Sequence, residues 1–137
     1  MWRGCEVEKR QALTVTVDAV PENLALVRSR LRCWLESAGV GAETAADVLL
    51  AVGEATANAA EHARSGVAHT VQMTMQALLV GNCLDLEVSD NGRWKPVEPA
   101  AGYRGHGLKL IEALVDSSAV TTTQDGTTVN MRKELSR

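Results

Sequence analysis

The chain has 137 residues, of which 45% are hydrophobic and 23% charged, and its formal net charge is −3. Such a chain is typical of one soluble globular domain that buries roughly two thirds of its unfolded surface. The negative charge excludes a mainly electrostatic nucleic-acid binder, and no apolar run reaches the ~18 residues that a membrane span needs. We therefore expect a single domain over residues 1–137 with a flexible start over residues 1–10. We also expect a cytoplasmic location, because the N-terminus lacks the apolar stretch of a signal peptide. From the charge and the short apolar runs, we expect neither a direct nucleic-acid partner nor a membrane partner.

The N-terminal half begins with apolar residues that alternate with polar ones over Leu13–Val17, which predicts a strand. Pro21 stands where a helix can start, and apolar residues at helical spacing follow it as far as Gly39, a typical helix terminator. The spacing predicts a second helix from about Glu43 to Ala63.

In the C-terminal half, alternation predicts strands at 71–79 and 84–88, joined by a hairpin at Gly81-Asn82. Residues 91–105 contain three glycines and two prolines and are expected to form a loop. A third helix is expected from Leu108 to Val115, followed by a hairpin that pairs 120–123 with 129–131.

This element order predicts an α+β fold. Strand pairs joined by tight turns favour a two-layer sandwich, with a mostly antiparallel mixed sheet and the helices on one face. Three cysteines fit neither a disulfide framework nor a zinc spacing. Cys33 and Cys83 are expected to be small buried side chains.

The second helix carries an unusual polar stripe, formed by Glu54, Asn58 and His62 at i, i+4 and i+8. An amide oxygen such as that of Asn58 is a suitable ligand for Mg²⁺, and a carboxylate one turn away could accept a proton from a nucleophile. The alternative for this pair is ordinary polarity of a helix surface. A local hydrogen bond is the alternative for His62, which has no Cys or His partner at metal spacing.

Asp90 continues the alternation of 84–88, so its carboxylate should point into the core, where it needs a donor. An adenine amino group, together with a bridging water, would supply one, and Gly92 would let the backbone pass close to the base. Thr127 shares the parity of Val129 and could reach the same pocket. The alternatives are a plain Asp-Asn-Gly turn and an ordinary strand threonine.

A glycine-bearing segment, Gly105-His106-Gly107-Leu108, directly precedes the third predicted helix. The free N–H groups at a helix start attract anions, and glycines would let a phosphate approach the backbone. The alternative is a plain helix start.

Taken together and in this order, the segments resemble the Bergerat-fold (GHKL) ATP-binding superfamily, and in particular its anti-sigma factor serine/threonine kinase branch. Residues 54–63 look like the N box, and Asp90-Asn91-Gly92 looks like the first glycine box. Residues 105–108 look like the second glycine box, and Gly126-Thr127 looks like the terminal Gly-Thr element.

The resemblance implies ATP and Mg²⁺ as cofactors, and roles for several residues. Asn58 would coordinate Mg²⁺ at the ATP phosphates, and Glu54 would activate the acceptor hydroxyl. Asp90 would recognise the adenine amino group with help from Thr127, and Gly105 and Gly107 would line the phosphates through their amides. The remaining nucleotide-binding positions of the motifs are His62, Gly92, Arg104, His106 and Leu108.

The implied partners are a STAS-type anti-sigma factor antagonist, which would supply a serine or threonine in trans, and a sigma factor held by the kinase. Arg28 on the first predicted helix would be a partner contact, and a homodimer is also compatible with the family. Between Asp90 and Gly105 lie only fifteen residue steps, so the ATP lid is short. Arg93, Lys95 and Arg104 are its cations for a γ-phosphate.

The short lid leaves alternatives open. The protein is either a protein kinase or a non-catalytic or weakly catalytic ATP-binding regulatory module that acts through protein contacts. Glu54 favours the kinase, because a pure binder would not need it. A structural α+β domain with chance motifs is a third, remote alternative.

Overall fold

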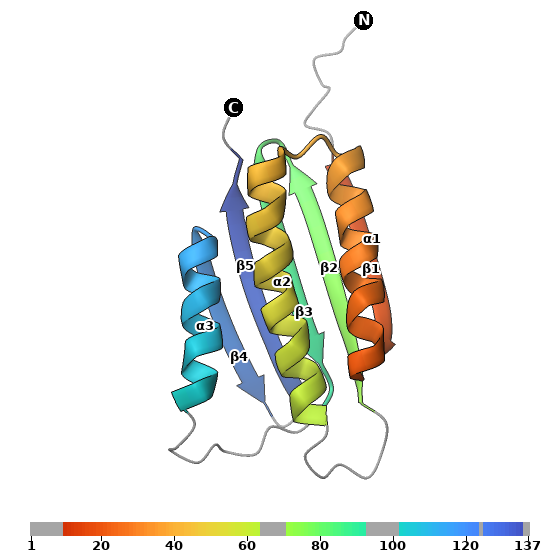
Figure 1. The fold of residues 1–137 in the computed structure, drawn as a ribbon, viewed down its shortest axis with the longest axis vertical. Helices are drawn as coiled ribbons and strands as arrows, with labels where there is room; N and C mark the ends of the chain where they lie inside the picture. The colour runs from red at the N-terminus through yellow and green to blue at the C-terminus, as the bar shows by residue number, and fades with distance from the viewer. Residues whose placement is uncertain (1–9, 64–70, 93–101, 124, 136–137) are drawn as a thin grey trace, which may run out of the picture.

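The computed structural model describes residues 10–63, 71–92, 102–123 and 125–135, with only the backbone of Arg10, Ala63 and 102–107. These residues form a five-stranded sheet with helices against one of its faces (Figure 1). The elements, in chain order, are β1 (Arg10–Asp18), a short 3-10 helix η1 (Pro21–Asn23), α1 (Leu24–Ser37), α2 (Ala42–Ala63), β2 (Gln72–Val80), β3 (Cys83–Asp90), α3 (Gly102–Leu114), β4 (Ser117–Thr123) and β5 (Gly126–Glu134).

The strand order in the sheet is β1-β2-β3-β5-β4, and each described pairing is antiparallel. This confirms the predicted α+β sandwich, with a sheet that is antiparallel throughout the described strands. Strand β5 lies between β3 and β4 and is antiparallel to β3, so the C-terminal end of β3 lies beside the start of β5. This pairing sets Asp90 opposite Thr127.

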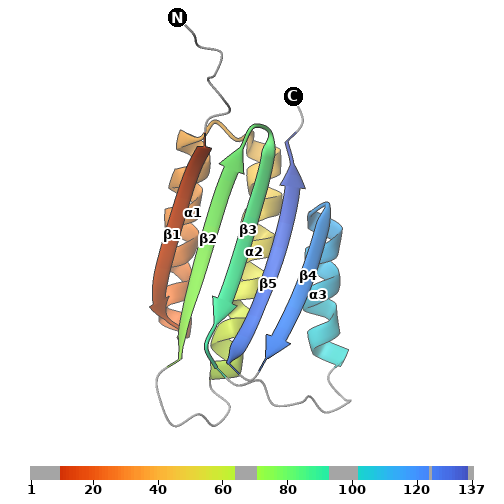
Figure 2. The same cartoon turned by 180° about the vertical axis from the view of Figure 1, so that it is seen from behind.

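The helices form one layer, in which α2 lies between α1 and α3 (Figure 1). Viewed from behind, the opposite face of the sheet is not covered by any described helix (Figure 2). Apolar side chains alternate along the strands, so one set is buried beneath the helices. The largest fully buried side chains of this core include Leu31, Leu35, Met73, Met75, Leu84, Leu86, Ile111 and Met131.

The central helix α2 packs on the sheet through small residues. Val48, Val52, Ala55 and Ala59 are all at most 3% exposed. Alanine side chains let a helix lie close to a sheet, and burial of this face stabilises a helix more than its intrinsic propensity does. Thr56 on the same helix donates to the Val52 carbonyl oxygen at 2.9 Å, so its buried hydroxyl is satisfied.

The starts of α3 and β4 and the burial of two cysteines differ from the sequence-based expectation. Helix α3 begins at Gly102 and not at Leu108, and β4 begins at Ser117 and not at Val120. Glycines at the start of α3 and an edge strand with mostly exposed side chains weaken the apolar pattern that marks a boundary. Cys33 is exposed and Cys83 is partly exposed, so their predicted burial was wrong.

Candidate nucleotide site

A cavity lies between α2, α3 and the sheet, beneath the C-terminal half of α2. Its volume is about 10 Å³, which is room for about one water molecule. The cavity brings together five of the predicted site residues, drawn from four different elements. They are Asn58 and His62 of α2, Asp90 of β3, Leu108 of α3 and Thr127 of β5.

Asp90 is the charged group of this cavity. Gly92 donates its backbone N–H to Asp90 Oδ1 at 3.0 Å, and the backbone N–H of Thr127 also donates to the carboxylate. Burial raises the pKa of the Asp90 carboxyl above its ordinary value, while these two donors lower it by a smaller amount. The carboxylate is therefore held in place with acceptor capacity still facing the cavity.

Gly92 also has a packing reason to be glycine. A Cβ at this position would lie 3.2 Å from Cγ1 of Val71, which is closer than most such contacts. Gly92 thus donates its N–H to the Asp90 carboxylate at a position where a side chain would crowd Val71. Its expected close approach to an adenine base stays a prediction.

Thr127 is 3% exposed, and its Oγ1 has no hydrogen-bond partner among the described residues. A buried hydroxyl without a partner is costly, so it marks a place where a ligand or a water would be stabilised. Gly126 before it has φ 150° and leaves no space for a side chain, since a Cβ would overlap the Asp90 carbonyl oxygen. The Gly-Thr pair thus lets β5 approach β3 closely enough to set Thr127 beside Asp90.

The three polar residues of the stripe on α2 do not line the same cavity. Asn58 and His62 line the cavity, and His62 is 7% exposed, whereas Glu54 lies on a separate groove that faces α1. Successive residues of an α-helix turn by about 100°, so each four-residue step rotates the stripe by about 40°. Over the eight residues from Glu54 to His62, the stripe therefore rotates by about 80°. The structure brings Asn58 and His62 to the cavity side of α2 and turns Glu54 away from it.

The second glycine segment lies inside α3. Gly105 and Gly107 stand at the fourth and sixth positions of a helix that begins at Gly102, so they do not precede it as expected. Only the first four N–H groups of a helix lack an intrahelical acceptor, so the amide of Gly107 is not free in this arrangement. Leu108 reaches the cavity, while the side chains of Arg104 and His106 lie outside the described residues, as do Arg93 and Lys95 altogether.

Sequence reasoning missed the apolar lining of the cavity. Val88 and Val129 share strand parity with Asp90 and Thr127, so the alternation that placed the polar pair also indicates these two apolar neighbours. The contribution of β4 follows from the predicted hairpin, because Val120 pairs with Val129. The apolar lining consists of Ala55, Ala59, Val88, Leu108, Val120 and Val129.

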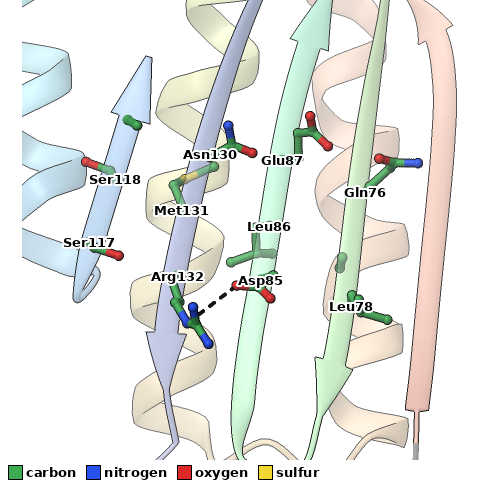
Figure 3. A pocket seen from close by; sticks show the side chains of 12 residues that line it. Gln76, Leu78, Asp85, Leu86, Glu87, Ser117, Ser118, Asn130, Met131 and Arg132 are labelled. Carbon is green, nitrogen blue, oxygen red and sulfur yellow. Dashed lines mark ion pairs between the residues drawn. The ribbon is translucent and has the colours of Figure 1, made fainter. Parts of the chain in front are cut away.

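A shallow basin of about 500 Å³ lies on the uncovered face of the sheet (Figure 3). Gln76, Glu87 and Asn130 project from adjacent strands into it, and Arg132 pairs with Asp85 at 3.7 Å. None of the predicted site residues lines this basin. The predicted site residues that line a cavity or groove in the described part of the chain therefore lie on the helix side of the sheet.

The described part of the chain holds no cluster of acidic, histidine or cysteine side chains suited to a metal ion. No three His, Cys, Asp or Glu side chains there are grouped to hold an ion. A Mg²⁺ ion held by nucleotide phosphates, by waters and by a single amide oxygen needs no such cluster. Among the same residues, none of the helices is long and apolar enough to cross a membrane.

The histidine kinase-like ATPase domain family matches residues 17–133, which include all the cavity residues. The chain belongs to this family. Within the family, it is 32% identical over 119 residues to the serine-protein kinase RsbW of Listeria monocytogenes serotype 4a (strain HCC23). The match covers 76% of this chain and 75% of that protein. RsbW of Listeria monocytogenes serovar 1/2a (strain ATCC BAA-679 / EGD-e) is 33% identical over 119 residues.

A crystal structure of the RsbU and RsbW domains of Rv1364c from Mycobacterium tuberculosis has the same fold. The TM-score is 0.76 at 30% sequence identity, and the match covers 93% of this chain but only 33% of that longer chain. Membership of an ATPase domain family implies ATP binding. The polar residues that meet at the cavity are Asn58, His62, Asp90 and Thr127.

Proposed function

We propose that this member of the histidine kinase-like ATPase family is an ATP-dependent protein serine/threonine kinase and anti-sigma factor. It phosphorylates an anti-sigma factor antagonist of STAS type and holds a sigma factor when the antagonist is unavailable. The observation that carries the proposal is the cavity lined jointly by Asn58, Asp90 and Thr127, on a chain that resembles RsbW serine-protein kinases.

The hydrogen-bonding groups that line the cavity suit an adenine. The Asp90 carboxylate would accept from the exocyclic amino group, and the unpartnered Thr127 hydroxyl would bond a ring nitrogen directly or through a water. Val88 and Val129 would supply the apolar walls for the ring. Asn58 would contribute an amide oxygen to Mg²⁺, which supplies charge neutralisation at the phosphates.

Nucleotide binding requires the cavity to open. Small-molecule sites usually measure about 300–1,000 Å³, whereas this cavity is about 10 Å³. Leu108 on α3 closes one side, and the C-terminal end of α3 is tied to the sheet because Lys133 Nζ donates to the Leu114 carbonyl oxygen at 2.9 Å. The N-terminal half of α3 is therefore the part that would yield to the nucleotide, which would also release the amide of Gly107.

In the transfer step, the acceptor hydroxyl oxygen bonds to the γ-phosphorus while the bond from that phosphorus to the β,γ-bridging oxygen breaks, leaving ADP. Glu54 takes the hydroxyl proton. The second candidate function is an ATP-binding regulator with little or no transfer. It is favoured by one observation, namely that Glu54 lines the α1-side groove and not the cavity.

Glu54→Gln separates these two functions. We expect the variant to bind ATP as the wild type does, and to lose roughly 10²–10⁴-fold in phosphate transfer to an antagonist protein from the same organism. The readout is transfer of labelled γ-phosphate, with ATP affinity measured in parallel by calorimetry. Equal transfer by both proteins would remove Glu54 as the base, and absence of transfer by the wild type would favour the regulator.

A further inference from the structure

Strand β4 forms one edge of the sheet. It pairs with β5 on one side, and no described strand pairs with its other side, which we call the β4 edge (Figure 2). Alternate backbone N–H and C=O groups of an edge strand point away from the sheet, where another extended chain can bond to them. All residues of β4 except Ser118 are exposed, so the described helices leave this edge accessible.

Sheets usually protect an edge strand with a charged side chain, a proline or a bulge, each of which hinders pairing with another chain. Strand β4 has none of these. Its sequence is Ser-Ser-Ala-Val-Thr-Thr-Thr, and all seven residues pair with β5 in an unbroken register. The other edge strand, β1, carries a charged residue at each end. The β4 edge is therefore the less protected of the two, and its four β-branched residues favour strand pairing.

The side chains of β4 alternate between the two faces of the sheet. Val120 pairs with the buried Val129 on the helix side, where Val120 is itself 39% exposed. Thr121 pairs with Thr128 on the uncovered face. On an added strand, a β-branched side chain would cover Val120 and a hydroxyl would lie beside Thr121. Cross-strand pairs of both kinds stabilise a sheet.

Carboxylates lie at both ends of the β4 edge. Asp116 directly precedes the strand, and Asp125 lies in the turn that follows it. Both are exposed, and neither takes part in the two ion pairs formed by the described residues. Asp116 accepts the backbone N–H of Glu134 at 2.6 Å, which orients its carboxylate without neutralising it. The cation in register with the first residue of β4, Arg132, is paired with Asp85. A complementary strand therefore has a basic residue at each end.

We infer that the β4 edge binds an extended segment of a partner protein, which adds a sixth strand to the sheet. The segment has seven uncharged residues, with a β-branched one against Val120, and a basic residue at each end, near Asp116 and Asp125. Main-chain hydrogen bonds hold the segment, while its ends and its contact with Val120 select it. The inference does not rest on the proposed function, because neither ATP nor Glu54 takes part.

Fluorescent nine-residue peptides test the inference. Their seven central residues alternate valine and threonine, and their two ends are both lysine, both glutamine or both glutamate. Binding to the full chain is followed by fluorescence anisotropy without nucleotide. We expect the lysine-ended peptide to bind about fivefold more tightly than the glutamine-ended peptide, since exposed ion pairs are weak. The glutamate-ended peptide should bind most weakly.

Two N-methylated peptides show whether the segment binds as a strand. In one, every second backbone amide of the lysine-ended peptide is methylated, and in the other the remaining amides are. A strand at an edge bonds to the sheet through only one of these sets. One peptide should therefore lose roughly tenfold or more in affinity, while the other binds like the unmodified peptide.

Hydrogen exchange and a charge reversal locate the bound segment. The amides of β4 should exchange more slowly when the lysine-ended peptide is bound, while those of β1 keep their rates. Asp125→Lys should remove the preference for lysine over glutamine ends. Asp18→Lys is the matched control, since Asp18 is an exposed carboxylate at the end of the other edge strand, and it should leave the preference unchanged. Thermal melts of both variants verify that they fold.

The inference is overturned if the lysine-ended peptide does not bind, if the two N-methylated peptides bind alike, or if β1 is protected in place of β4. An equal change of preference in Asp18→Lys and Asp125→Lys would also overturn it. These outcomes are distinct from failure of the proposed function. ATP binding without peptide binding would contradict the β4 inference alone, and peptide binding without ATP binding would contradict the kinase assignment alone.

Discussion

Replacing Thr127 by valine should move stability and ligand affinity in opposite directions. Valine has nearly the same volume as threonine, so the change removes a buried hydroxyl without leaving a void. An unpartnered buried hydroxyl costs ~1–3 kcal/mol by protein mutational data. A single water in the cavity of about 10 Å³ would bring the cost to the lower end of that range, so we expect a gain of about 1 kcal/mol.

Urea denaturation without nucleotide measures this gain, which corresponds to a rise in melting temperature of roughly 3–5 °C for a domain of this size. The same variant should bind ATP about 2- to 12-fold more weakly, because a neutral hydrogen bond contributes about 0.5–1.5 kcal/mol. Thr128→Val is the matched control, since Thr128 is the next residue on β5 and does not line the cavity. A loss of stability in Thr127→Val would refute the reasoning, because it would mean that the hydroxyl is satisfied without a ligand.

Two further predictions concern charge. Burial raises the pKa of Asp90, so its contribution to stability is fully present below the ordinary value of 3.8 and is lost as the pH rises through the raised pKa. The unfolding free energy of the wild type should therefore fall relative to that of Asp90→Asn across this window, and parallel pH curves would count against the assignment. Lys133→Met should lower the unfolding free energy by about 1–2 kcal/mol, because the last turn of α3 loses a donor and a favourable cation. The exposed Lys109 of α3 is the control, and an equal loss in Lys109→Met would show that Lys133 does not anchor the helix.

The strands could be predicted because their side chains alternate between a core and a polar face. Parity alone placed Asp90 and Thr127 on the core side, and the sheet order then set them against each other. The start of α3 could not be predicted, because Gly105 and Gly107 each cost about 1 kcal/mol in a helix and give no apolar period. The packing of Ile111, which is 1% exposed, supplies stabilisation that a local pattern does not reveal.

The sequence also did not predict that Glu54 and Asn58 line two separate cavities. Spacing of four residues indicates a common side of a helix, but it does not say which neighbour lies there. Helix α1 packs on one side of α2 and α3 packs on the other, so residues of the stripe line two different cavities. Glu54 was therefore found on a groove and Asn58 on a cavity.

The central claim is that the cavity around Asp90 binds a Mg-nucleotide. It is tested most directly by calorimetric titration of ATP, with and without Mg²⁺, into the wild type, Asp90→Asn and the control Asp85→Asn, which changes a carboxylate on the uncovered face of the sheet. The account predicts Mg-dependent binding to the wild type and to the control, and roughly 10- to 150-fold weaker binding to Asp90→Asn. Failure of the wild type to bind ATP, or equal affinity of all three proteins, would contradict it.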